Sequence, residues 1–138
     1  MTHILLSHHY PEEYNRCIKV TFRKKEYYLC ARCFGYFSSF FVLLLISFFF
    51  NSLFVQIDWI LLYILPSFAI IDWALTKFHI NNGTNKSRYI TGFLLGITGS
   101  RLIYLFLNNP INYKIYYTII PYFLLIGLLI LVNKFIKN

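Results

Sequence analysis

The chain has 138 residues, enough for one domain, and 58% of them are hydrophobic, 21% aromatic and only 13% charged. A water-soluble fold of this size needs more polar residues than this to cover its surface. The composition therefore excludes an ordinary soluble domain and predicts that most side chains face lipid. The net charge of +8 does not indicate nucleic-acid binding, because the basic residues gather beside apolar runs. A bilayer with anionic lipid head groups is the expected partner.

Residues 1–33 form a polar, basic head. Within it, residues 18–22 alternate apolar and polar at period two, residues 23–26 are typical of a polar turn, and residues 27–30 can return as a second strand. This pattern predicts a short β-hairpin. Because such a hairpin is barely stable alone, we expect a membrane contact, a metal ion or both to support it.

Residues 34–138 predict an all-α membrane domain of four transmembrane helices. The expected spans cover residues 34–55, 59–74, 89–107 and 116–132. Polar residues between Asn51 and Asp58 predict the turn between the first two spans, and Pro66 predicts a kink in the second. Small residues at 92, 96 and 99 predict that the third span is the central, closely packed helix.

The distribution of Lys and Arg predicts the orientation. Six lie in the head, none between the first two spans, three in residues 77–88, one before the fourth span and two at the end. By the positive-inside rule, the chain is integral to the cytoplasmic membrane with both termini cytoplasmic. The head would then lie in a reducing compartment.

All three cysteines and three of the four histidines fall within the head. Cys30 and Cys33 place two thiols on one turn, Cys17 lies across the predicted hairpin, and His8 or His9 can complete a tetrahedral shell. This set favours a structural zinc ion. Two other interpretations stand beside it: ordinary residues of a small basic head, or a redox pair in which Arg32 activates a thiolate.

Three motifs carry a resemblance to a known family. They are Leu29-Cys30-Ala31-Arg32-Cys33-Phe34-Gly35-Tyr36, Asp72-Trp73 at the end of a span, and Asn85-x-Ser87-Arg88-x-x-Thr91-Gly92 at the start of the next. With the His-rich start and the later Cys17, they make residues 8–100 resemble the integral membrane proteins named for domain of unknown function 2085. The resemblance implies a small polytopic membrane protein and supplies no reaction.

Ionisable residues inside spans need partners, because unpaired charges at membrane depth are costly. Asp72 lies near the cytoplasmic end of the second span, level with Arg88 and near Arg32 and the thiols, and we expect an Asp72–Arg88 ion pair. The candidate ion-pair or ligand-binding residues at this level are Arg32, Asp72, Asn85, Ser87 and Arg88. Arg101 lies twelve residues into the third span, about 18 Å from its start. Asp58, at the outer start of the second span, is its expected partner.

These features favour a binding module with a cytoplasmic zinc knuckle. Its basic rim would face anionic lipid head groups or a phosphorylated ligand and would comprise Arg16, Lys24, Lys25, Arg32 and Arg88. One alternative is a membrane thiol–disulfide oxidoreductase using Cys30 and Cys33, which would need an exterior location and usually a second cysteine pair. Another is a small transporter subunit with Asp72 and Arg101 along its path, which would require a homo-oligomer. Hydrolase and kinase motifs are absent, and enzyme activity is left open.

Overall fold

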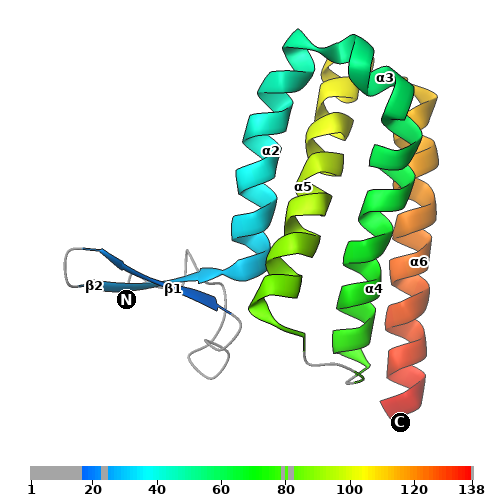
Figure 1. Cartoon of the computed structure of the whole chain (residues 1–138). Helices are drawn as coiled ribbons and strands as arrows, with labels where there is room; N and C mark the ends of the chain where they lie inside the picture. The colour runs from blue at the N-terminus through cyan, green and yellow to red at the C-terminus, as the bar shows by residue number, and fades with distance from the viewer. Residues whose placement is uncertain (1–16, 23–24, 79, 81–82, 138) are drawn as a thin grey trace.

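A computed structural model describes residues 17–22, 25–78, 80 and 83–137 as a small hairpin followed by a bundle of long helices (Figure 1). Four helical segments in these ranges are long and apolar enough to cross a membrane: Ala31–Phe49, Asn51–Lys77, Asn85–Asn108 and Tyr113–Ile136. The prediction of an all-α membrane domain with four spans is therefore confirmed. The hairpin and the C-terminal end of α6 (Tyr113–Lys137) lie at the same end of the bundle. We call this the head end.

The predicted hairpin is also confirmed. Strands β1 (Cys17–Phe22) and β2 (Lys25–Cys30) pair antiparallel, and their register sets Cys17 directly opposite Cys30. No linker follows, because β2 runs straight into α2 (Ala31–Phe49), with Cys30 as its N-cap. The end of the hairpin is thereby fixed against the first turn of a spanning helix.

The prediction that residues between Asn51 and Asp58 form the turn joining the first two spans is wrong. Helix α2 ends at Phe49, and the next helix, α3 (Asn51–Trp59), begins after a single residue. The second span continues through the π-helical turn η2 (Ile60–Ile64) into α4 (Leu65–Lys77). Asn51 and Asp58 both bind Arg101 inside the bundle, so these polar side chains need no aqueous loop and the helix can include them.

The irregular turn η2 ends just before Pro66. Proline lacks the backbone donor of a regular helix, and buried carbonyls near it need other partners. Two neighbouring helices supply them: the Thr98 hydroxyl donates to the Leu61 carbonyl at 2.6 Å, and the Tyr122 hydroxyl donates to the Tyr63 carbonyl. The second span is thereby tied to both α5 (Asn85–Asn108) and α6.

Helix α5 lies between α2 and α4 (Figure 1) and buries the largest share of its residues among the four spans, as its small residues predict. Gly35 of α2 abuts the Tyr89 carbonyl, and Gly96 of α5 abuts the Tyr36 carbonyl. The Ser39 hydroxyl also donates to the Phe93 carbonyl at 2.7 Å. Backbone-to-backbone contact of this kind makes α2 and α5 a rigid pair on which the polar groups of the head end are mounted.

Candidate functional site

All three cysteines lie at the head end. Cys17 and Cys30 are both buried and face each other across the hairpin, and Cys33 lies in the first turn of α2. Cys33 lies close to Cys30, its nearer neighbour of the two, and to Cys17. No disulfide joins these three residues, all of which the structure describes.

The predicted zinc site is only partly covered by the structure. His8 and His9 lie outside the described residues. Within the described ranges, no three or more His, Cys, Asp or Glu side chains are grouped closely enough to hold a metal ion. Cys17, Cys30 and Cys33 are all described and do not form such a group, so the zinc ion and its imidazole ligand both stay predictions.

A polar cluster around Asp72 lies beside the thiols. Arg32, on the first turn of α2, forms an ion pair with the Asp72 carboxylate on α4. From α5, the Ser87 hydroxyl donates to Asp72 Oδ1 at 2.6 Å and the Thr91 hydroxyl to Oδ2 at 3.3 Å. Three helices thus meet at one carboxylate, which is 13% exposed.

Arg32, and not Arg88, is the cation that pairs with Asp72, which corrects the sequence prediction. Ser87 and Thr91 lie four residues apart and share the face of α5 that meets α4. Arg88 follows Ser87 directly, so it points about 100° away around a helix of 3.6 residues per turn. Its buried guanidinium instead lies near the backbone of Gly83, before the helix starts.

The start of α5 is well defined and connects the cluster to the hairpin. Gly83 adopts a φ of +63°, which glycine tolerates best, and the Thr84 hydroxyl then caps the helix by accepting the Ser87 N–H at 3.2 Å. The Asn85 side-chain amide donates to the Cys17 carbonyl at 3.2 Å. Asn85 therefore holds the first strand against the bundle, a positioning role that the sequence analysis did not assign.

A second charged cluster lies at the opposite end of the bundle. Arg101 donates to Asp58 through Nε at 2.6 Å and Nη2 at 3.3 Å, as the sequence analysis expected, and through Nη1 to Asn51 at 2.9 Å. Lys114 of α6 also donates to Asp58, at 2.7 Å. Sequence reasoning missed both Asn51 and Lys114; the single basic residue before the fourth span was the only signal for the latter.

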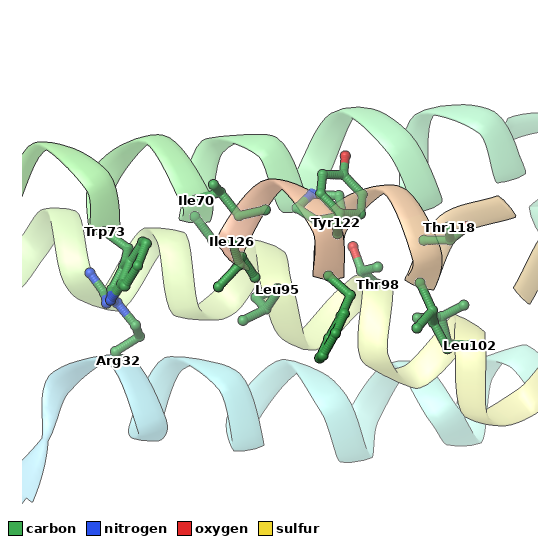
Figure 2. A pocket seen from close by; sticks show the side chains of 13 residues that line it. Arg32, Ile70, Trp73, Leu95, Thr98, Leu102, Thr118, Tyr122 and Ile126 are labelled. Carbon is green, nitrogen blue, oxygen red and sulfur yellow. The ribbon is translucent and has the colours of Figure 1, made fainter. Parts of the chain in front are cut away.

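An apolar groove of about 560 Å³ runs along α4, α5 and α6 and reaches Arg32 (Figure 2). Figure 2 shows Arg32 and Trp73 together at one end, with Leu102 and Thr118 at the other. Its further lining residues include Ala69, Leu95, Thr98, Tyr122 and Ile126. From the sequence, the third span was expected to pack closely against its neighbours in preference to lining a ligand groove, so this groove was not predicted.

Comparison with protein families places these features in context. The family described as predicted membrane protein (DUF2085) matches residues 13–102, well over half of the chain. The chain belongs to this family. No curated protein and no solved structure matches the chain significantly. The DUF2085 match includes the hairpin, the thiols and the whole Asp72 cluster, whereas α6 and Lys114 lie beyond it.

Proposed function

We propose that this DUF2085 protein is a membrane-embedded binding module whose head is held by zinc and presents a basic surface to anionic lipid head groups. The observation that carries the proposal is that Cys17 and Cys30 face each other across the hairpin and Cys33 follows within the first turn of α2, beside Arg32. If the ion drew the three sulfurs together, they and one imidazole from His8 or His9 would satisfy tetrahedral zinc. Metal binding would also supply the stability that a two-stranded hairpin lacks.

The basic surface is supported by Lys25, which is exposed on β2. Of the other expected cations of the rim, Arg88 is buried and Arg32 is paired with Asp72, although both lie where the head meets the spanning helices. The hairpin lies roughly crosswise to the helices at this end of the bundle (Figure 1). That direction would lay it along the membrane surface, where a cation attracts anionic head groups by about 1 kcal/mol.

Zinc content tests the proposal. The purified protein is expected to contain about one zinc per chain, and Cys17→Ser, Cys30→Ser and Cys33→Ser are each expected to remove most of it, because each deletes one of four ligands. Zinc is measured by elemental analysis after extensive dialysis. His8→Ala and His9→Ala, tested singly, identify the imidazole ligand.

His79→Ala is the matched control, since it removes the one histidine outside the head, and it is expected to retain zinc. A stable, folded preparation without metal would refute the zinc knuckle. If that preparation instead contained a Cys30–Cys33 disulfide, the result would favour the oxidoreductase alternative.

The orientation is a separate prediction. A green fluorescent protein fused after Asn138 is expected to fluoresce, and alkaline phosphatase fused there is expected to be inactive, because Lys134 and Lys137 favour the cytoplasmic side. Because the head and the C-terminal end of α6 lie at the same end of the bundle, one fusion at the C-terminus reports the side of the membrane on which each of them lies. The opposite pair of results would put the thiols outside and contradict the reducing environment assumed for zinc.

A further inference from the structure

The interior of the groove is apolar although three hydroxyl groups line it. Thr98 donates to the Leu61 carbonyl, Thr118 to the Lys114 carbonyl at 2.7 Å, and Tyr122 to the Tyr63 carbonyl. These donors are therefore engaged by the protein backbone. A ligand lying along the groove would meet mainly hydrocarbon, so the body of the ligand should also be hydrocarbon.

The head end of the groove is different, because Arg32 lines it. Asp72 receives donors from Ser87 and Thr91 as well as from one nitrogen of Arg32, so its charge does not depend on the guanidinium alone. A guanidinium carries five N–H donors. The Arg32 Nε is buried and has no hydrogen-bond partner among the described residues. Because this atom is buried, a ligand in the groove would meet the remaining, more accessible part of the guanidinium, since the Arg32 side chain as a whole is 28% exposed.

The length of the groove fits one chain of a lipid. Its lining on α6 extends from Thr118 to Ile126, about 12 Å at 1.5 Å per residue. One leaflet of the hydrocarbon core is about 15 Å deep. The volume of about 560 Å³ lies within the range of small-molecule sites.

The α6 wall of the groove is the least packed part of the bundle. This helix buries the smallest share of its residues among the four spans, and Tyr122 and Lys114 tie it to the second span. A lipid chain that entered from the bilayer would add dispersion contacts that these helices do not make with each other.

We infer that the groove binds one anionic phospholipid, with a hydrocarbon chain between α4, α5 and α6 and the phosphate at Arg32. This inference rests on the proposed function for its preference for anionic head groups and adds a defined site within the membrane. Arginine suits phosphate because its planar donors match the phosphate oxygens.

Fluorescence of Trp73 tests the site. The chain has two tryptophans, so Trp59→Phe leaves Trp73, at the head end of the groove, as the only one. The variant is reconstituted with phosphatidylglycerol or phosphatidylcholine carrying identical brominated chains, which quench tryptophan on contact. We expect about a tenfold preference for the anionic lipid, because the choline cation of phosphatidylcholine already neutralises its phosphate. A hydrogen bond from Arg32 to an uncompensated phosphate charge contributes enough for that ratio.

Two sets of variants separate the head-group and chain contacts. Arg32→Gln combined with Asp72→Asn removes both charges without leaving one unpaired, and it is expected to abolish the preference, whereas Arg32→Lys should keep part of it. Ile126→Phe, which narrows the groove, should reduce quenching by both lipids. Leu128→Phe is its matched control, because Leu128 is 58% exposed on the same helix, and it should leave quenching unchanged.

The outcomes distinguish this site from the proposed function. If the preference survived the Arg32→Gln/Asp72→Asn change but disappeared when Lys24 and Lys25 were replaced by Gln, recognition would lie on the head alone. The proposed function would then stand and the groove site would be refuted. Equal quenching by both lipids in every variant would refute both, and quenching unaffected by Ile126→Phe would refute the chain site.

Discussion

Replacing Asp58 with alanine is expected to lower the free energy of unfolding by about 3–5 kcal/mol. The Asp58 side chain is 4% exposed and is the carboxylate shared by Arg101 and Lys114. Arg101 is 1% exposed, so the substitution leaves a buried guanidinium whose charge only the Asn51 amide and nearby aromatic rings can contact. Steric trapping in bicelles measures the unfolding free energy of a membrane protein without leaving a lipid environment.

Two further variants distinguish the cost of losing an ion pair from the cost of leaving one buried charge without a partner. Lys114→Met should cost only about 0–1 kcal/mol, because its side chain is 25% exposed and such pairs contribute little. The double variant Asp58→Leu/Arg101→Leu should cost less than the sum of its single changes, since it leaves neither charge unpaired. If Asp58→Ala cost less than 1 kcal/mol, Arg101 would not depend on this carboxylate.

The spans and the hairpin could be predicted because each depends on a local pattern. Apolar runs of sufficient length indicate spanning helices, and period-two alternation indicates strands, whatever the rest of the chain does. The predicted helix boundaries were wrong where a polar residue has a buried partner. Asn51 and Asp58 were assigned to a turn because polar residues between two apolar runs usually lie in water. The Asp58–Arg101 pair was expected, but the Asn51–Arg101 contact, 50 positions apart, was not, and together they let the helix include both residues.

The Asp72 cluster shows which part of a site a sequence can predict. Depth along the helices follows from counting residues, and it brought Arg32, Asp72 and Arg88 to about the same level. The direction of each side chain around its helix depends on how the helices are rotated against their neighbours. That rotation is set by the α2–α5 contact, and it turns Ser87 and Thr91, but not Arg88, toward Asp72.

The groove could not be predicted because it is a space between helices, not a property of any one of them. Helix α6 is apolar on all sides, so its sequence does not specify which face meets α4 and α5. In lipid there is no hydrophobic force to close the gap between them. Specific polar contacts fix α6 instead, including those of Lys114 and Tyr122 with the second span.

Gly92→Ala and Gly96→Ala are each expected to destabilise the bundle by about 1–3 kcal/mol, with values nearer the larger figure. A Cβ at Gly92 would overlap the Arg32 backbone carbonyl, and one at Gly96 would overlap the Tyr36 carbonyl and the Ser39 hydroxyl. A clash with backbone cannot be relieved by a new rotamer, so α2 must move away from α5. Steric trapping measures the loss of stability.

Gly127→Ala is the matched control, because a Cβ there meets nothing within 4 Å. It should be neutral or stabilising, since alanine favours a helix by up to about 1 kcal/mol over glycine. Gly92→Ala has an additional effect that Gly96→Ala should not share: it displaces the first turn of α2, which carries both Arg32 and Cys33. Gly92→Ala should therefore lower zinc content and lipid preference more than Gly96→Ala at equal loss of stability. Equal effects of all three alanine substitutions on stability would show that α2 and α5 are not in backbone contact.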